Sequence, residues 1–194
     1  RRLPRGATRF SRRAKGRVWE TVFKELAGDA DHEYAMIDRT IVRAHQHSAE
    51  RKKNGAKAIG QSKGGLRTKI HATGDALGNP TSFHLTEGQA HDLDGADVLL
   101  PLVQADTVLG DRGYDADARV LEPLEAAGKR AVIPLKKNRK EQRWYDKALD
   151  KARHAIENFF AKLKQFRAIA TRYDKTARNF RAAIHLVSSI IWLN

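Results

Sequence analysis

Three carboxylates that lie far apart in the chain have the residue types needed for metal-assisted chemistry. Asp38 lies within the apolar run "YAMIDRTIVRAHQ" at 34–46, Asp111 ends the short run "TVLGD", and Glu157 lies in the basic, aromatic-rich stretch "ARHAIENFFAKLKQF" at 152–166. A buried carboxylate is costly without a partner, so Asp38 and Asp111 each require an arginine, backbone donors or a metal. Their hard oxygen ligands suit magnesium or manganese.

The spacing around Glu157 predicts an amphipathic helix. Arg153, Glu157 and Lys164 lie four and seven residues apart on one face, next to an apolar stripe formed by Ile156, Phe159, Phe160 and Leu163. We therefore expect Glu157 to border the core rather than to face open water.

The three carboxylates would converge if the helix lies beside the strands that carry Asp38 and Asp111. Together they would hold two divalent ions about 4 Å apart, an arrangement that activates an attacking oxygen and stabilises a leaving one in phosphoryl displacement. Arg153 and Lys164 would then face phosphates. Separate salt bridges and helix caps are the alternative, and they are the better explanation for any one of the three residues taken alone.

Alternating runs and turn signals predict a mixed α/β fold. A long strand at 34–46 precedes a polar loop at 47–65 and a hairpin at 66–88, whose turn is "GDALGNP"; helices and strands then alternate, with a glycine stop at the end of the helix at 116–128 and a buried helix at 182–193. Strands joined by helices are normally parallel. We expect antiparallel hairpin strands followed by parallel strands, with helices on both faces.

The charge balance predicts an anionic partner, with nucleic acid as the first candidate. Lysine and arginine total 37 against 23 acidic residues, which gives a formal net charge of +14. The loop "KKNRK" at 136–140 provides candidate phosphate contacts, although a merely solvated loop is the alternative; these contacts are Lys136, Lys137, Arg139 and Lys140.

Other classes of protein fit this composition less well. No run approaches the roughly 18 apolar residues of a membrane-spanning helix, and the absence of cysteine excludes disulfides and thiolate zinc sites. We expect a reducing, cytoplasmic compartment. The first residue is arginine, which is consistent with a fragment or a processed product.

Several strings resemble the DDE-type transposases of bacterial insertion sequences, especially the group called insertion sequence family five. The resemblance covers about residues 15–194. It is carried by "MIDRTIVRAHQH", "GGLRTKIHATGDALGNP", "TEGQAHD", "GDRGYDADA", "IPLKKNRK" and "RHAIENFFAKLKQFRAIATRYDKTARNF".

This resemblance implies a ribonuclease-H-like fold of the retroviral integrase superfamily and an acidic triad that binds two Mg²⁺ or Mn²⁺ ions. The triad would be Asp38, Asp111 and Glu157, and the family signature around the glutamate places Arg153 and Lys164 at DNA; its tyrosine is replaced by Asp150 here. Possible neighbours of the site are Arg112, Tyr114 and His91, with packing as the alternative for the tyrosine.

The implied reaction is hydrolysis at an element end, followed by attack of the freed 3'-hydroxyl on target DNA. The partners would be double-stranded DNA and further copies of the chain, on the bacterial nucleoid. We expect residues 1–30 to form a basic arm and short helix, the remnant of a DNA-binding region, and 31–194 to form the catalytic domain. An inactive DNA-binding remnant and a nuclease that cuts without joining are the alternatives.

Overall fold

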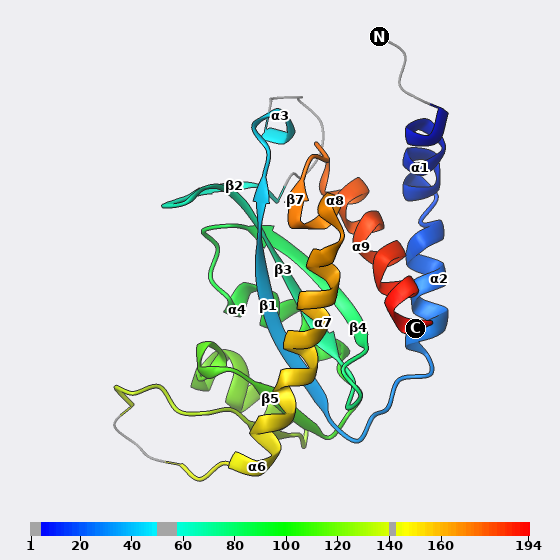
Figure 1. The fold of residues 1–194 in the computed structure, drawn as a ribbon. Coiled ribbons are helices and arrows are strands. Elements are labelled where there is room, and N and C mark those ends of the chain that lie inside the picture. Colours follow the sequence, from blue (N-terminus) through cyan, green and yellow to red (C-terminus); the bar gives the residue numbers. More distant parts are fainter. Residues whose placement is uncertain (1–4, 50–57, 140–142) are drawn as a thin grey trace.

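The computed structural model describes residues 5–49, 58–139 and 143–194 and shows a curved sheet with helices packed against it (Figure 1). The strands are β1 (Ala35–Ala44), β2 (Gly60–Ser62), β3 (Gly65–Gly74), β4 (Pro80–Glu87), β5 (Thr107–Gly110), β6 (Arg130–Val132) and β7 (Thr171–Arg172). The α-helices are α1 (Arg5–Lys15), α2 (Val18–Ala27), α3 (Gln46–Ala49), α4 (Leu93–Leu99), α5 (Glu122–Ala126), α6 (Lys147–Asp150), α7 (His154–Gln165), α8 (Arg167–Ala170) and α9 (Ala177–Trp192). Single turns of other helix types are η1 (Leu100–Leu102), η2 (Arg112–Tyr114), η3 (Asp117–Leu121) and η4 (Lys151–Arg153).

The sheet is mixed, as the sequence predicts. Its order is β2-β3-β1-β5-β6, with β4 also paired to β3 and β7 to the end of β1. β3 is antiparallel to β1, β2 and β4, whereas β5 and β6 run parallel to β1. Antiparallel hairpin strands therefore precede parallel strands joined by helices, and the expected mixed α/β arrangement is confirmed. The two-residue strand β7 was not foreseen.

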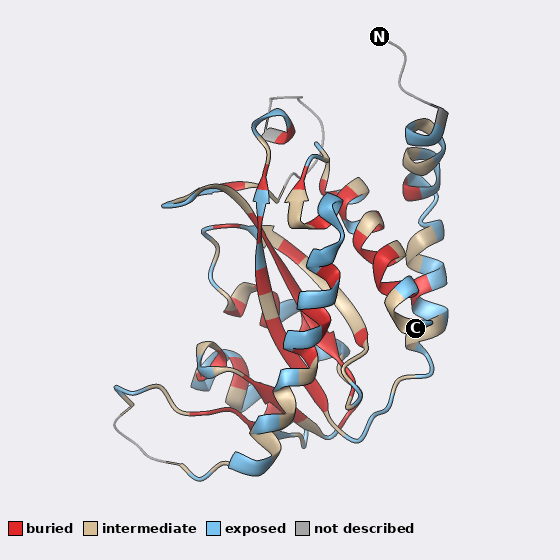
Figure 2. Cartoon of the chain, in the orientation of Figure 1, coloured by how far each residue is buried: buried red, intermediate tan, exposed pale blue. Residues whose placement is uncertain are grey.

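Side chains that alternate along β1 are buried in two separate hydrophobic cores. Met36 is buried with side chains of α7 and α9, and its neighbour Ile37 is buried with side chains of α4 and α5. Successive side chains of a strand point to opposite faces, so a single strand can serve both cores. Figure 2 shows the resulting buried path along β1 and β3. Helices on both faces are thus confirmed.

The predicted helix around Glu157 is α7, and its apolar stripe packs on the sheet. Ile156, Phe159, Phe160 and Leu163 are all buried in the core that contains Met36. Spacing of three and four residues puts these side chains on one side of the helix. In Figure 1, α7 crosses β1 along this face. The stripe fixes which α7 residues can reach the strand carboxylates.

The amino-terminal region differs from the expected arm. Residues 5–15 form α1 rather than an arm that leads into a helix, because α1 and α2 both pack beside α9. The short helix expected within residues 1–30 is α2, which begins at Val18 and ends before Gly28. Phe23 anchors α2: its ring lies 5.1 Å from those of Phe83 and His185.

Candidate active site

The register of the sheet brings two distant aspartates together. Ile37 of β1 is paired with Gly110 of β5 in a parallel ladder, so the residues that follow them, Asp38 and Asp111, are neighbours. Asp38 is on the same face of β1 as Met36, which is the face covered by α7. Asp111 immediately follows the last residue of β5. The carboxyl ends of parallel strands are common ligand-binding positions in α/β sheets.

Local backbone geometry orients the Asp111 carboxylate. Asp111 precedes η2, and its Oδ1 accepts a hydrogen bond of 2.8 Å from the backbone N–H of Gly113. A Cβ atom at position 113 would lie 2.8 Å from the same oxygen, closer than side chains tolerate. The glycine in "GDRGYD" therefore permits this close approach.

Asp38 is more deeply buried than its neighbour. Burial raises the pKa of its carboxyl to about 6, and the negative charge of Asp111 acts in the same direction. A hydrogen bond of 2.7 Å from the backbone N–H of Arg39 opposes the shift. A buried carboxylate beside a second negative charge is a place where a cation is electrostatically favoured.

A side-chain cation already lies beside this acidic pair. The Nη1 atom of Arg39 is 3.9 Å from Asp38 Oδ1 and 3.8 Å from Asp111 Oδ2. Its Nε is closer, at 2.9 Å, to Oδ2 of Asp92. Arg39 thus links three carboxylates while keeping about a third of its side chain exposed.

Asp92 is held by cations rather than acting as a helix cap. Asp92 precedes α4 with helical backbone angles, and its side chain makes no capping hydrogen bond within the described residues. Its Oδ1 instead accepts a hydrogen bond of 2.7 Å from Lys69, which also donates to the Ala90 carbonyl oxygen. Burial disfavours its ionised form, but Lys69 and Arg39 outweigh that cost and lower the pKa of Asp92.

Glu157 approaches the pair through an arginine. Its carboxylate lies 3.7 Å from Nη1 of Arg153, whose Nε donates a 2.9 Å hydrogen bond to Asp150. The charge of Arg153 also acts on Asp38 and Asp111. The expectation that Glu157 borders the core is wrong, because 59% of its side chain is exposed. It projects from α7 on the outer side of the packed stripe.

The donors present suit a hard divalent ion, although they are not assembled around one. Asp38 and Asp111 supply carboxylate oxygens next to each other, which is the ligand chemistry magnesium and manganese prefer. Over residues 5–49, 58–139 and 143–194, however, no group of three or more histidine, aspartate or glutamate side chains is arranged to hold a metal ion. Arg39 and Arg153 stand among the carboxylates instead.

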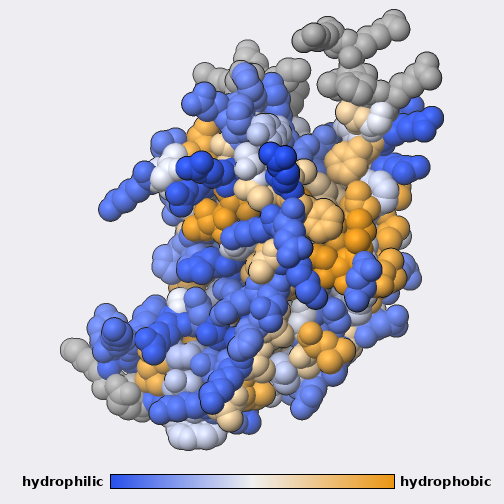
Figure 3. All heavy atoms as spheres, in the orientation of Figure 1, coloured by the Kyte–Doolittle hydropathy of each residue, from blue (hydrophilic) through white to orange (hydrophobic). Residues whose placement is uncertain are grey.

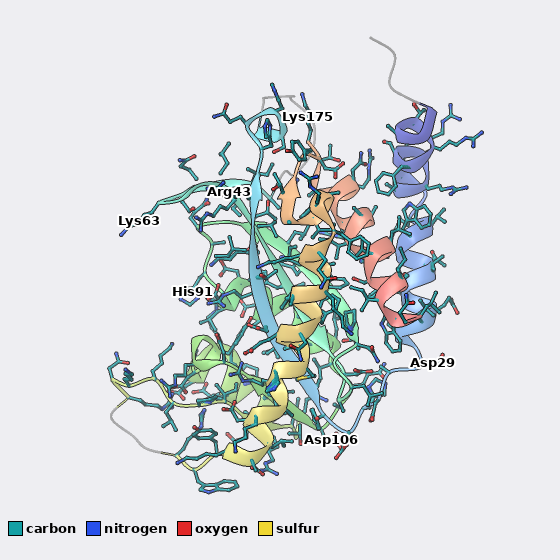
Figure 4. The ribbon with its side chains drawn as sticks, viewed as in Figure 1. Asp29, Arg43, Lys63, His91, Asp106 and Lys175 are labelled. Carbon is teal, nitrogen blue, oxygen red and sulfur yellow. The ribbon has the colours of Figure 1, made fainter. Side chains whose placement is uncertain are left out.

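The three residues predicted to neighbour the site, Tyr114, Arg112 and His91, differ in burial and in position. Tyr114 is fully buried, and its hydroxyl has no hydrogen-bond partner in the part of the chain described. Burial, with the charges of Asp38 and Asp111, raises its pKa. Arg112 is exposed beside Asp111. His91, labelled in Figure 4, lies in the segment before α4, where its Nδ1 accepts a hydrogen bond from the Leu93 backbone N–H.

Two residues of the basic loop predicted to contact phosphates, Lys136 and Arg139, are bound to the segment that follows Asp111. Asp115, which is almost fully buried, accepts hydrogen bonds from the Lys136 backbone N–H at 2.8 Å and from Arg139 at 2.7 Å. Arg139 also pairs with Asp117. Lys137 is exposed, and Lys140 lies outside the described residues.

Lys164 belongs to the other end of α7. It is exposed seven residues after Glu157, which at 1.5 Å per residue is roughly 10 Å along the helix axis. The structure therefore brings Arg153 to the acidic pair and leaves Lys164 about two turns away. In Figure 1, α7 runs past β1 toward α8. Arg153 lies just before α7 and Lys164 in its last turn, so these two predicted DNA contacts lie at opposite ends of the helix.

The chain thus combines a mixed sheet with two neighbouring carboxylates, Asp38 within β1 and Asp111 directly after β5. Residues 29–192 match the family described as "Transposase DDE domain", and the chain belongs to this family. The expected DDE-type transposase resemblance is thereby confirmed. Divalent metal ions are general cofactors of the family.

A curated relative agrees with this assignment. The putative transposase for insertion sequence element IS6501 from Brucella ovis is 39% identical over 132 residues, which is 66% of this chain and 99% of that protein.

Solved structures similar to the chain come from Mos1 transposase. They include its strand transfer complex, with 12% identity and a TM-score of 0.37, and its isolated catalytic domain, with 13% identity and a TM-score of 0.35. Both comparisons cover the whole of this chain, which spans 61% of the first structure's chain and 93% of the second's.

Sequence reasoning missed the cations at the centre of the site. Asp38 was expected to need a partner such as an arginine, yet Arg39 was not identified, and neither was Lys69. The available signal for Arg39 was the alternation along β1, which puts Arg39 on the same face of the strand as Ile37. Lys69 lies on the neighbouring strand, where the register pairs it with Ile41 of β1. Asp115 was missed because nothing in "GDRGYDADA" indicates the distant arginines it binds.

No helix in the described part of the chain is both long and apolar enough to cross a membrane. This agrees with the absence of a long apolar run in the sequence.

Proposed function

We propose that this chain is the catalytic domain of a DNA transposase that cuts DNA at element ends and joins the freed 3'-hydroxyl to target DNA. The observation that carries the proposal is the in-register pairing of Ile37 with Gly110, which makes neighbours of Asp38 and Asp111. Membership of the transposase family gives that acidic pair its chemical context.

In this proposal Asp38, Asp111 and Glu157 hold the divalent ions. When bound, two ions supply an activated oxygen nucleophile and neutralise charge on the leaving oxygen. Asp38 and Asp111 are fixed by the sheet and by the Gly113 hydrogen bond. Glu157 is exposed on α7 and is paired with Arg153, so it must exchange that partner to join them. Arg153 would then be available to hold a DNA phosphate.

The proposed partner is double-stranded DNA, bound by exposed cations around the site. The net charge of +14 favours such a polyanion, and Lys164, Lys137 and Arg112 are exposed. Figure 3 shows a mostly hydrophilic surface on the face where α7 lies. Related structures named above include a strand transfer complex, and a paired end complex of Mos1 is also similar. By analogy we propose that several copies act together on DNA, at the nucleoid.

The amino-terminal helices provide a second proposed DNA contact. A cavity of about 610 Å³ between α1, α2 and α9 is lined by four cationic side chains. They are Lys15, Arg17, Arg178 and Arg181. This supports the proposal that residues 1–30 belong to a DNA-binding region, joined to a catalytic domain at 31–194.

The test is nicking of supercoiled plasmid by the purified chain with Mg²⁺ or Mn²⁺. We expect nicking that disappears with chelator and with Asp111→Asn, while DNA retention in a gel-shift assay persists. Binding without nicking under either metal would instead support an inactive DNA-binding remnant.

A strand-transfer assay distinguishes a transposase from a nuclease. A labelled duplex with a free 3'-hydroxyl is incubated with the protein, the metal and a plasmid. Label that becomes covalently attached to the plasmid supports the proposal. Nicking without joining supports the nuclease alternative.

A further inference from the structure

We propose that Arg39 is an internal competitor of the divalent ion, and that Asp92, backed by Lys69, restrains this arginine at the edge of the site. The inference rests on the metal site of the proposed function. Asp92 is therefore a positioning residue, which acts on the acidic pair only through Arg39.

Arg39 occupies a position that a metal ion would contest. Its Nη1 is almost equidistant from one oxygen of Asp38 and one of Asp111, at 3.9 and 3.8 Å. A guanidinium carries one positive charge that cannot be removed near neutral pH. It neutralises part of the repulsion between the two carboxylates, and the same charge repels an approaching cation.

The end of β5 explains how Arg39 reaches the pair. In β1, Arg39 points away from the face that carries Asp38, because neighbouring residues alternate. β5 ends at Gly110, next to Ile37, so no further β5 residue pairs with Asp38 or Arg39. The long side chain can then contact carboxylates on the opposite face through the space beyond this strand end.

Asp92 holds Arg39 more closely than the acidic pair does. The distance from Arg39 Nε to Asp92 Oδ2 is 2.9 Å, about 1 Å shorter than either contact to the pair. Asp92 is itself fixed by Lys69, whose side chain is 11% exposed and whose second hydrogen bond is to the Ala90 carbonyl oxygen. The carboxylate is thus shared between two cations from neighbouring strands.

This arrangement predicts opposite effects of Arg39→Gln and Asp92→Asn on the affinity for Mn²⁺. Arg39→Gln removes the competitor, so Mn²⁺ should bind about three- to tenfold more tightly, the effect expected for a partly exposed ion pair. Asp92→Asn weakens the restraint and lets Arg39 pair fully with Asp38 and Asp111. Mn²⁺ should then bind about threefold more weakly. In the double variant Arg39→Gln/Asp92→Asn, the loss caused by the asparagine should disappear.

The experiment is calorimetric titration of Mn²⁺ into the full chain without DNA, at fixed ionic strength. The set comprises the wild type, the three variants above, Asp111→Asn as the site control and Arg17→Gln, at the residue before α2, as a charge-matched control. Arg17 pairs with Glu20 at 2.6 Å and is mostly exposed. Thermal unfolding without metal checks that each variant is folded. Arg39→Lys, which retains the charge, is a conservative second variant, and we expect its affinity for Mn²⁺ to lie between those of the wild type and Arg39→Gln.

The outcomes separate this inference from the proposed function. Tighter binding by Arg39→Gln, lost again with Asp111→Asn and absent from Arg17→Gln, supports the competitor role. If the wild type binds Mn²⁺ through Asp111 but Arg39→Gln binds no better, the competitor role is overturned and the metal site stands. If neither the wild type nor Arg39→Gln binds Mn²⁺, the metal site itself is wrong, and the inference with it.

Discussion

Asp38 and Asp111, which are 73 positions apart in the chain, are neighbours because the residues before them, Ile37 and Gly110, are paired in a parallel ladder. Their proximity is therefore a property of the sheet register. A slip of one residue would turn either side chain to the opposite face and separate the pair. The buried Met36 and Leu109, which belong to one core, oppose such a slip.

The exposure of Glu157 predicts a separation of activity from stability. Glu157→Gln should lower the plasmid-nicking rate at least about a hundredfold, a loss of about 3 kcal/mol of transition-state stabilisation, because a metal ligand is removed. The free energy of unfolding should change by less than about 0.5 kcal/mol, since the ion pair with Arg153 is weak and exposed. Nicking kinetics and urea unfolding measure the two effects. Unchanged nicking would remove Glu157 from the proposed triad.

Asp115 should be important for stability as well as for the basic loop. Asp115→Ala leaves Arg139 and Arg143 without their buried partner and should cost about 3 kcal/mol of unfolding free energy, as measured in urea. Asp117→Ala is the matched control. Its side chain is 57% exposed and shares Arg139, so its loss should cost under about 1 kcal/mol. Equal losses in the two variants would contradict the anchoring role of Asp115.

Buried histidines should weaken the fold in mild acid. Burial lowers the pKa of His185 to about 4 from an ordinary value of 6.5, and Arg181 adds to this shift. The unfolded chain therefore binds the proton first, so stability falls as the pH drops from about 6.5 to 4 and is unaffected by this group above that range. The full contribution is about 3 kcal/mol. His71, whose pKa burial also lowers to about 4, acts in the same direction.

Substitution of His185 separates its contribution to the pH dependence of stability from the opposing contribution of Asp38. The pKa of Asp38 is raised to about 6 in the folded protein, so the folded state binds this proton more readily than the unfolded chain does. Protonation of Asp38 therefore stabilises the folded protein as the pH falls. His185→Leu should flatten the fall in unfolding free energy between about pH 6.5 and 4, measured by urea titration at several pH values. The exposed His32→Leu is the control. A slope that persists in His185→Leu would show that other groups cause it.

Exposed lysines in the last turn of α7 and in the basic loop should set the salt dependence of DNA binding. Lys164→Ala and Lys137→Ala should each reduce the slope of log affinity against log salt by about 1, because each loses one phosphate contact. Arg119→Gln is the control, since Arg119 is already paired with Asp94 and Asp97. Fluorescence anisotropy with a labelled duplex provides the slopes. A slope unchanged in Lys164→Ala would place the DNA away from the end of α7.

The sheet and the main helices were predictable from sequence because their signals are local. A long run of β-branched and apolar residues identified β1, and the turn residues of "GDALGNP" identified the hairpin of β3 and β4. Helical spacing identified the buried stripe of α7. The glycine stop after α5 is also confirmed: Gly128 has a φ of 70°, which favours glycine. The family resemblance added the ribonuclease-H-like class, and the match to the transposase DDE domain confirms the family.

The environment of the acidic residues was not predictable in the same way. Whether Glu157 faces water depends on how α7 rotates over the sheet, and its spacing alone fits both positions. The partner of Asp92 depends on Lys69, which is 23 positions away and meets it only when β3 lies beside α4. The helical state of residues 5–15 depends on packing against α9 rather than on local charge.

The packing of Phe23 has a practical consequence for the boundaries of shorter recombinant versions. The family match begins at residue 29, which invites expression from that point. Such a protein would lack α2 and would uncover the rings of Phe83 and His185, together with the side of α9 that α2 covers. Exposed apolar surface of this kind favours self-association. Expression from a residue before α1 keeps α1 and α2 packed against α9, so this apolar surface stays covered.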